Sequence, residues 1–561
     1  MEELALQEID ELEANVAQFR SGELSLEEFR PRRTLYGVYG QRQRERYMVR
    51  VRVPQGRLTP EQLLTLADIA ESFSRGFAHV TTRQDIEYHF VLLEHMPALL
   101  RQLAAVDLTT REAGGNIVRN VTCDPLSGVC GDAVFDVTPH ADALAGHFLR
   151  NPVSQELPRK IKIALSGCPC DHALTWVHDI GAQAAVSGDR RGFRLLVGGG
   201  LGALPRGADV LEEFVPEEEL VPLCEAIVRA FQRTGDRKRR QRARLKFVLA
   251  RLGLETFRKL VHEERRQVPA APDLLDTRAE LEEPAPLRTG EPAPAERTPE
   301  YHRWRQVCVL PQKQAGFAVA AVALPAGKIT AGQLRALADI AREFALRPRT
   351  TIYQNIVLRW AREEHLPALH AALARHNLAQ PTAETLLDPV ACPGAETCAS
   401  AITNGKALAR ALISQLEESE YLEDEAARRI QVKISACPNA CGQHPVADIG
   451  LYGGALHADG RLLPMYHLLV NSNGFGQLLA RLPARRAPQA VRALVEDYRS
   501  RRLPEERFRP FARRVGLGEL RAVIAPLLPP PAFVEDPEAY LDWEATKLFS
   551  LEERGEGECA V

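Results

Sequence analysis

The sequence lacks the segments that would place a protein in a membrane or direct it through one. No run approaches the roughly 18 apolar residues that a transmembrane helix needs. The start, MEELALQEIDELEANVAQFR, is acidic and amphipathic, without the basic segment and apolar core of a secretory signal. We therefore expect a cytoplasmic protein with no membrane partner.

A large excess of either charge is also missing. The chain has 71 Lys and Arg against 74 Asp and Glu, which gives a formal net charge of −3. Proteins that coat nucleic acid carry a strong positive excess, so this class is disfavoured. The strongest basic run, 235–247, has no interleaved aromatic residues and no second basic stripe, so we expect no nucleic-acid partner.

What the chain does contain is a repeat of itself. LTPEQLLTLADIAESF (58–73) aligns with ITAGQLRALADIAREF (329–344) at an offset of 271 (329 − 58 = 271). SGCPCDHALTWVHDIG (166–181) aligns with SACPNACGQHPVADIG (435–450) at an offset of 269 (435 − 166 = 269). EHMPALL with EHLPALH, and FVLARLGLETF with FARRVGLGELR, keep the same order. Four blocks with nearly one offset indicate a duplicated chain.

Strands and helices alternate within each half. RYMVRVRV (46–53) alternates as a half-buried strand does, whereas 58–73 and 329–344 have the apolar spacing of amphipathic helices. Further strands are expected at 77–82, 161–165 and 193–199. This interleaving predicts an α+β fold of mixed layers rather than a helical bundle or a β-sandwich.

Cysteines are closely spaced in the second half. ACPGAETC places Cys392 and Cys398 in a C-x5-C pattern, and ACPNAC places Cys437 and Cys441 in a C-x3-C pattern. Four thiolates in two close pairs suit a four-iron four-sulfur (4Fe–4S) cluster or a structural zinc. Because zinc sites typically use the tighter C-x2-C, the spacing favours the cluster, with zinc or inert thiols as alternatives.

The first half has the same loops without the four-cysteine set. The pairs at an offset of 269 are Cys123 with Cys392, Cys168 with Cys437, and His172 with Cys441 (392 − 123 = 269). Cys130 lies one residue from the position that faces Cys398. With Cys170, this half has a C-x6-C and a C-x-C, which match no common metal motif. They leave open a second metal, a disulfide or another redox role.

The cysteine pattern, in the second copy of a duplicated chain, resembles that of the sirohaem-dependent sulfite and nitrite reductases. The resemblance runs from about Leu35 to about Val523 and includes TTRQDIEYHF, RNVTCDP, LPRKIK and LVGGGLG. It implies that Cys392, Cys398, Cys437 and Cys441 bind a 4Fe–4S cluster. It also implies that Cys441 is the proximal ligand of the sirohaem iron. A shared thiolate couples the two groups electronically, so a substrate can be reduced one electron at a time.

The resemblance gives each half a ferredoxin-like subdomain and a sirohaem/4Fe–4S reductase domain. The expected units are an N-terminal helical extension (1–34), the first ferredoxin-like subdomain (35–110), the first reductase copy (111–265), a Pro/Glu-rich linker (266–303), the second ferredoxin-like subdomain (304–380), the second reductase copy (381–525) and a C-terminal tail (526–561).

Four cations of the first half are expected to bind the substrate. Reduction of an oxyanion needs fixed positive charge and a source of protons. The resemblance assigns this role to Arg83, Arg119, Lys160 and Lys162. Lys160 and Lys162 lie two apart in a predicted strand, so their ammonium groups share one face. The second copy has Asp388, Arg429 and Gln431 opposite Arg119, Lys160 and Lys162. This difference indicates that one copy holds the cluster and the other binds the anion.

Sirohaem carries eight carboxylates and needs cationic and backbone donors. We expect Arg244 and Lys246 in the basic run, Gly199 and Gly200 in LVGGGLG, and Asn120 to contact it. The glycines of that loop do not form a G-x-G-x-x-G motif, so a dinucleotide site is not predicted.

The expected activity is the assimilatory six-electron reduction of sulfite to sulfide. Family members that reduce nitrite tend to replace the second lysine of RKxK with asparagine, whereas this chain has Lys162. No site for a flavin or nicotinamide is predicted, so the electron donor would be ferredoxin or a flavoprotein subunit. The alternatives are nitrite reduction to ammonia, a related corrinoid-biosynthesis monooxygenase, and a non-catalytic iron–sulfur electron-transfer protein.

Overall fold

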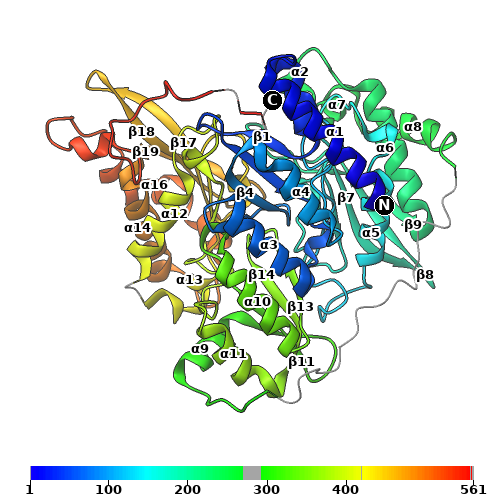
Figure 1. The fold of residues 1–561 in the computed structure, drawn as a ribbon. Helices are drawn as coiled ribbons and strands as arrows, with labels where there is room; N and C mark the ends of the chain where they lie inside the picture. Colours follow the sequence, from blue (N-terminus) through cyan, green and yellow to red (C-terminus); the bar gives the residue numbers. More distant parts are fainter. Residues whose placement is uncertain (1, 270–291, 418–419, 556, 559–561) are drawn as a thin grey trace.

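Four β-sheets and the helices that cover them form the protein (Figure 1). The computed structural model describes residues 2–269, 292–417, 420–555 and 557–558. Within these ranges, no helix has the length and apolar character needed to span a bilayer. The architecture is the mixed α/β arrangement expected from the interleaved pattern.

The N-terminal part is a pair of helices followed by an antiparallel sheet. The helices are α1 (Glu2–Ser21) and α2 (Leu26–Leu35). The sheet has the order β1 (Val38–Gly40), β2 (Tyr47–Val51), β4 (Ile86–Val91), β3 (Phe77–Val80) and β12 (Lys328–Thr330). Its helices are α3 (Pro60–Phe73) and α4 (Met96–Ala104).

The second half begins with the matching subdomain. Its antiparallel sheet has the order β10 (Val309–Pro311), β11 (Phe317–Val322), β14 (Ile356–Arg362) and β13 (Arg347–Thr350). Its helices are α9 (Pro299–Cys308), α10 (Ala331–Glu343) and α11 (Leu366–Ala374). α3 and α10 lie side by side in Figure 1, so the two subdomains share one interface.

Each half ends in a five-stranded mixed sheet. The first copy has β5 (Thr122–Cys123), β6 (Ile163–Ser166), β7 (Ile180–Ser187), β8 (Arg190–Val197) and β9 (Asp209–Pro216). The second has β15 (Val390–Ala391), β16 (Val432–Ser435), β17 (Ile449–Ala458), β18 (Arg461–Val470) and β19 (Gln477–Pro483). In both sheets the first two strand pairs are parallel and the last two are antiparallel.

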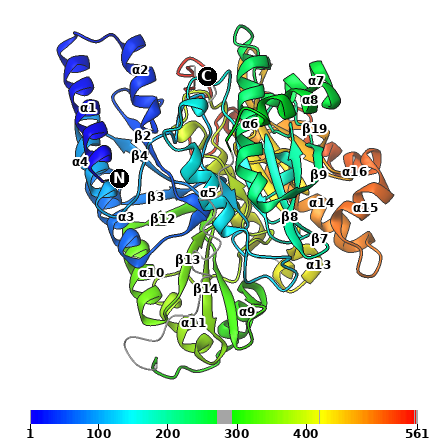
Figure 2. The same cartoon turned by 90° about the vertical axis from the view of Figure 1, so that its right-hand side faces the viewer.

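Equivalent helices cover these two sheets. The first copy has α5 (Thr138–Phe148), α6 (Leu220–Thr234), α7 (Leu245–Leu252) and α8 (Leu254–Arg265), and Figure 2 shows this group against the strands. The second has α12 (Gly405–Glu417), α13 (Glu425–Arg428), α14 (Ala487–Arg501), α15 (Phe508–Val515) and α16 (Leu517–Ile524).

Local sequence signals explain why the copies fold alike. Thr59 and Thr330 each accept a hydrogen bond from a backbone N–H at the start of α3 and α10, and Gln62 and Gln333 complete both capping boxes. Gly253 and Gly516 separate the last two helices of each copy at φ of 77° and 86°. Because only glycine adopts such angles at little cost, both copies keep it there.

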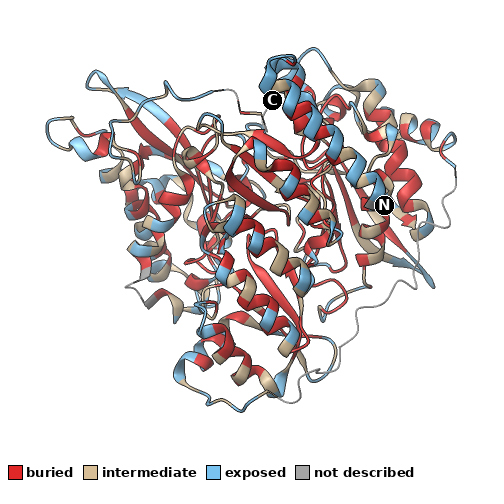
Figure 3. Cartoon of the chain, in the orientation of Figure 1, coloured by how far each residue is buried: buried red, intermediate tan, exposed pale blue. Residues whose placement is uncertain are grey.

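The halves exchange contacts in both directions. β12 of the second half pairs with β3 and completes the first sheet. Gln84 Nε2 donates to the Thr350 carbonyl at 2.9 Å, and Gln354 Nε2 donates to the Val80 carbonyl at 3.1 Å. Both ferredoxin-like subdomains share one apolar core. Figure 3 shows these central strands buried, whereas the outer faces of α1 and α2 are exposed. Neither half is a self-sufficient unit.

Segments outside the repeats were harder to predict. Of the expected linker (266–303), residues 270–291 lie outside the described residues, and α9 begins at Pro299 within it. The tail beyond residue 525 packs on the second copy, where Tyr540 is buried and Trp543 Nε1 donates to the Ala484 carbonyl at 2.9 Å.

The second copy has a small buried cavity where the first copy is predicted to bind an anion. Its volume is about 10 Å³, and its lining is Tyr353, Glu384, Thr385, Asp388, Val390, Gln431, Val432 and Lys433. Asp388 and Gln431 are the residues that the repeat places opposite Arg119 and Lys162. A space of this size holds about one water molecule. At these two positions the second copy therefore has a carboxyl and an amide in place of the first copy's cations.

Asp388 is expected to make stability depend on pH. Burial raises the pKa of Asp388 to about 7, above its value of about 3.9 in an unfolded chain. The folded protein therefore holds this proton more tightly, and the contribution to stability is lost as pH rises from about 4 through 7. The Asn355 side-chain amide and the Glu384 N–H both donate hydrogen bonds to Asp388 Oδ2. The Asp388→Asn variant keeps an oxygen that can accept them. We expect the difference between the Tm of the parent protein and that of the variant to decrease as the pH rises over that range.

Thermal unfolding of both proteins between pH 4 and 8 measures this difference. The matched control is Asp189→Asn, because Asp189 is exposed and should give a difference that does not vary with pH. A Tm difference for Asp388→Asn that is constant with pH would contradict the prediction.

Candidate functional site

The four second-half cysteines converge from two loops. Cys392 and Cys398 follow β15, and Cys437 and Cys441 follow β16, its parallel neighbour. Burial raises the pKa of the Cys392 thiol, and the other three thiols raise it further. The four thiols therefore lie close enough to interact electrostatically, with Cys437 buried and Cys441 exposed.

The arrangement fits a cluster better than a single ion. In the part of the chain that the structure describes, no three of these four sulfurs lie within 4.8 Å of one another. A 4Fe–4S cluster needs this wider cage because each thiolate binds a different iron. The Ala436 N–H also points at Cys392 Sγ, at 3.1 Å, and a thiolate is the better acceptor for it. These residues could therefore hold the predicted cluster.

Other parts of the chain fix the cysteine loops. Thr82 Oγ1, from the turn after β3, donates to the Cys441 carbonyl at 3.0 Å. The Arg42 N–H donates to the Thr397 carbonyl at 2.9 Å. From the C-terminal tail, the Gly555 N–H donates to the Ala399 carbonyl at 3.0 Å. Sequence reasoning missed the tail's contact because it lies beyond the last repeated block.

Arg83 lies in the same turn as Thr82 and has unused donors. Its Nη2 donates to the carbonyls of Asn120 and Ile163, the latter at 3.3 Å. Its Nε and Nη1 are buried and have no hydrogen-bond partner in the structure. Burial lowers the pKa of Arg83 to about 10. Buried donors without partners are costly, so this geometry fits a bound anion.

Lys162 connects the cations to the cysteines. Burial lowers the pKa of Lys162 to about 7, with smaller contributions from Arg83 and Arg244. The thiol of Cys441 opposes this shift, so the ammonium group lies within electrostatic reach of both the cations and that sulfur. Residues of both halves therefore lie within electrostatic reach of Lys162.

Arg119 and Lys160 complete the predicted substrate group. Arg119 is buried, and its guanidinium donates to the Ala113 carbonyl at 2.8 Å and to the Tyr39 hydroxyl at 3.2 Å. It is close enough to Arg83 to lower the pKa of that residue. Lys160 is half-buried and precedes Ile161, which bridges to Val118. The two lysines lie in extended chain just before β6 rather than inside it.

Two further residues at this site were not singled out from the sequence. Arg159 is buried, and burial lowers its pKa to about 10, with neighbouring arginines adding to the shift. His178 is also buried, and its pKa is lowered by burial and then by Arg83. Its Nδ1 donates to the Leu174 carbonyl at 2.8 Å. The sequence does contain a clue to Arg159, which stands directly before Lys160 in LPRKIK.

The residues predicted to contact sirohaem build one wall of the site. Arg244 Nη2 donates to Asp179 at 2.7 Å, and its Nε is buried without a partner. Lys246 Nζ donates to the Leu201 carbonyl at 3.0 Å. The Gly200 N–H donates to the Arg206 carbonyl at 2.9 Å, so this hydrogen bond stabilises the glycine loop.

Gly199 and Gly200 allow this wall to pack closely. A Cβ at Gly199 would lie 2.6 Å from the His178 carbonyl oxygen, and one at Gly200 would lie 2.8 Å from the Arg244 guanidinium. Asn120 Nδ2 donates to the carbonyls of Val53 and Arg83, at 3.0 and 3.2 Å. Its Oδ1 is buried without a partner.

The site is positively charged in a chain of almost no net charge. Its cations are Arg83, Arg119, Arg159, Lys160, Lys162, Arg244 and Lys246. The buried carboxylates Asp85 and Asp179 only partly balance them. Positive charge kept from water needs anionic partners. The unpartnered Arg83 and Arg244 nitrogens therefore fit an anionic cofactor together with an anionic substrate.

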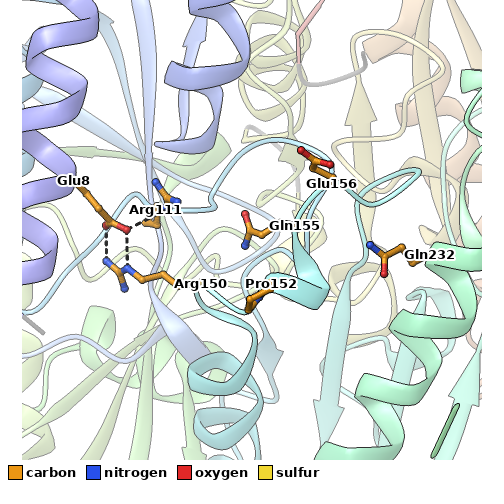
Figure 4. A pocket seen from close by; sticks show the side chains of 7 residues that line it. All are labelled: Glu8, Arg111, Arg150, Pro152, Gln155, Glu156 and Gln232. Carbon is orange, nitrogen blue, oxygen red and sulfur yellow. Dashed lines mark hydrogen bonds and ion pairs between the residues drawn. The ribbon is translucent and has the colours of Figure 1, made fainter. Parts of the chain in front are cut away.

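A cavity of about 400 Å³ lies elsewhere, beside the N-terminal helix (Figure 4). Glu8 of α1 forms two hydrogen bonds with Arg150, of 2.9 and 2.7 Å, and lies 3.6 Å from Arg111. None of its lining residues belongs to the predicted site. This cavity marks where α1 joins the first copy.

Comparison with known proteins agrees with this organisation. Residues 114–269 and 382–529 match the family model described as the nitrite and sulphite reductase 4Fe-4S domain. Residues 39–106 and 310–376 match that of the nitrite/sulfite reductase ferredoxin-like half domain. Two copies of each domain account for most of the chain.

Relatives with both activities cover the chain. The chloroplastic ferredoxin–nitrite reductase of Oryza sativa subsp. japonica is 31% identical over 81% of this chain and 73% of its own length. The sulfite reductase [ferredoxin] 2 of Mycolicibacterium paratuberculosis is 29% identical over 85% and 83%. The solved structure of the Mycobacterium tuberculosis NirA protein has a TM-score of 0.76 and 27% identity, over 89% of this chain and 92% of that one. The chain belongs to the nitrite and sulfite reductase family, which binds sirohaem and a 4Fe–4S cluster.

Proposed function

We propose that this oxidoreductase reduces sulfite to sulfide in an assimilatory six-electron reaction. The observation that carries the proposal is Lys162, whose ammonium group interacts electrostatically with both the Arg83 cation and the Cys441 thiol. When bound, sirohaem and the cluster supply electrons one at a time to the substrate. The chain's own contribution is to bind the anion and to deliver protons.

Arg83, Arg119, Lys160 and Lys162 hold the substrate in this proposal. The buried Arg83 donors supply charge-assisted hydrogen bonds to an oxyanion. Lys162, whose pKa is lowered to about 7 by burial, can give a proton to a departing oxygen near neutral pH. Arg119 is held by backbone carbonyls, so it adds fixed positive charge without having to reorganise.

The choice of sulfite rests on Lys162. Sulfite is a dianion and gains more from a fourth cation than singly charged nitrite does. Nitrite is the second candidate, because several relatives of about 30% identity are ferredoxin–nitrite reductases. The names of these relatives also support ferredoxin as the electron donor of this chain. We propose that the chain acts in the cytoplasm.

The proposal is tested by a spectrum and by kinetics on the two anions. Purified protein should show a Soret band and the long-wavelength bands of an isobacteriochlorin, and kcat/KM should be higher for sulfite than for nitrite. Absence of these bands would instead favour an iron–sulfur protein without catalytic activity. Sirohaem with no activity on either anion would reopen the corrinoid-biosynthesis alternative, and a large preference for nitrite would reverse the substrate choice.

Lys162→Asn tests the substrate choice directly. Loss of the fourth cation should lower kcat/KM for sulfite by about 100-fold and that for nitrite by much less. The control is Lys238→Asn, which removes an exposed lysine and should leave both values unchanged. Equal losses for the two anions would show that Lys162 does not discriminate between them.

Cys441→Ser tests the proposed shared ligand. The variant should lose the 4Fe–4S cluster and the sirohaem absorption together, because one sulfur serves both groups. Iron analysis and visible spectra measure the two losses, and far-UV circular dichroism checks that the fold remains. Cys224→Ser, which changes a buried thiol on α6, should retain both groups. Full iron and an unchanged spectrum in Cys441→Ser would refute the assignment.

A further inference from the structure

Three ligand-type side chains meet in the first copy, away from the four second-half cysteines. The ligand atoms of Cys130, Cys168 and His172 lie within 4.8 Å of one another. Among the described residues, no other set of three such side chains meets this closely. The repeat places these residues at or next to the positions of Cys398, Cys437 and Cys441, but their sequence spacing matches no common metal motif.

Two neighbouring parallel strands bring the three together. Cys130 lies in the loop that follows β5, whereas Cys168 and His172 lie in the loop that follows β6. Parallel neighbours end at the same edge of a sheet, so these loops lie side by side. The second copy uses the same edge for its cysteine set.

The distances suit one metal ion rather than a second iron–sulfur cluster. A tetrahedral zinc with bonds of about 2.3 Å to sulfur and about 2.0 Å to nitrogen holds its ligand atoms about 3.5–3.8 Å apart. Atoms already within 4.8 Å reach that spacing by small side-chain rotations. The fourth position of the cluster pattern is also missing, since Cys123 is fully buried and is not part of the group.

Nearby carboxylates favour a cation at this position. Asp124 Oδ2 accepts a hydrogen bond from Cys168 Sγ at 3.3 Å. Asp132 Oδ2 lies 3.8 Å from Cys170 Sγ, in the same loops. Once the Cys130 and Cys168 thiols lose their protons to a bound ion, they and the nearby Asp124 carry negative charge that a divalent cation would balance.

We propose that Cys130, Cys168 and His172 bind a zinc ion that is separate from the iron cofactors. Two thiolates and one imidazole are ligands that Zn²⁺ prefers, and Cys130 and His172 are only half-buried, which leaves a fourth position for water. The proposal does not depend on the substrate that the enzyme reduces.

The ion would fasten the first copy to the second half. Val129, next to Cys130, packs with Val357 and Trp360 of β14, and its carbonyl accepts the Lys313 N–H at 2.9 Å. A metal that joins the Cys130 loop to the Cys168 loop would therefore stabilise the contact between halves. We expect zinc removal to lower the Tm without shifting the absorption bands of the iron cofactors.

Metal analysis of the full-length holoenzyme, purified without added zinc, tests the proposal. Mass spectrometry of metals should find about one zinc per chain beyond the iron of the cofactors. X-ray absorption at the zinc edge should show two sulfurs at about 2.3 Å and lighter ligands at about 2.0–2.1 Å. The Cys130→Ser/His172→Gln double variant should lose the zinc and keep its iron and visible spectrum. Cys224→Ser, matched for the loss of one buried thiol, should keep the zinc.

Several outcomes would overturn the proposal. One is a holoenzyme that contains no zinc and takes up none from a Zn²⁺ solution. Another is full zinc in the double variant, or a zinc-edge spectrum without sulfur, either of which would mean an adventitious ion only. A Cys130–Cys168 disulfide in a non-reduced peptide digest would equally exclude the site. If the double variant fails to fold, the zinc-edge spectrum of the unmodified protein still decides the ligand set.

Discussion

The hydrogen bond from Thr82 Oγ1 to the Cys441 carbonyl, 3.0 Å long, joins the two functions of the protein. Thr82 precedes Arg83, whose buried donors face the proposed anion site, and Cys441 belongs to the cysteine set. One turn of the first half thus fixes both the cation and the loop of the proposed electron-transfer ligand. Because Thr82 and Arg83 are adjacent, the backbone of Arg83 is tied to the Cys441 loop, and the Asn120 and Ile163 carbonyls hold its guanidinium.

Burial sets the chemical character of the cations around this turn. Removing an ammonium or guanidinium group from water costs several kcal/mol unless an opposite charge is near. Asp179 forms a salt bridge with Arg244, whereas Nε and Nη1 of Arg83 have no hydrogen-bond partner in the structure. The protein therefore carries a strained electrostatic arrangement that anionic ligands relieve. In the second copy, Asp388 and Gln431 stand where the first copy has the cations Arg119 and Lys162.

The fold was predictable where the chain repeats a pattern. The blocks around 58–73 and 329–344 gave α3 and α10. The duplicated loops also located the candidate site, and the roles assigned to Lys162 and Cys441 stay predictions. Contacts that depend on tertiary proximity left no such signal. The hydrogen bond of the tail to the Ala399 loop joins segments that share no repeated pattern. The hydrogen bond of the Gly200 N–H to the Arg206 carbonyl, and that of Lys246 on α7 to the Leu201 carbonyl, were hidden for the same reason.

The exchange of strands between halves has a consequence for the history of the chain. β12 completes the sheet of the other half, and the Arg57–Arg349 bridge is the reciprocal contact. A single-copy ancestor could satisfy these edges only by pairing with another molecule of itself, as a strand-swapped homodimer with two identical reaction centres. After two copies were joined in one chain, each copy could change independently of the other. One copy could then keep the four-cysteine set, while the other kept the cations that are predicted to bind the substrate.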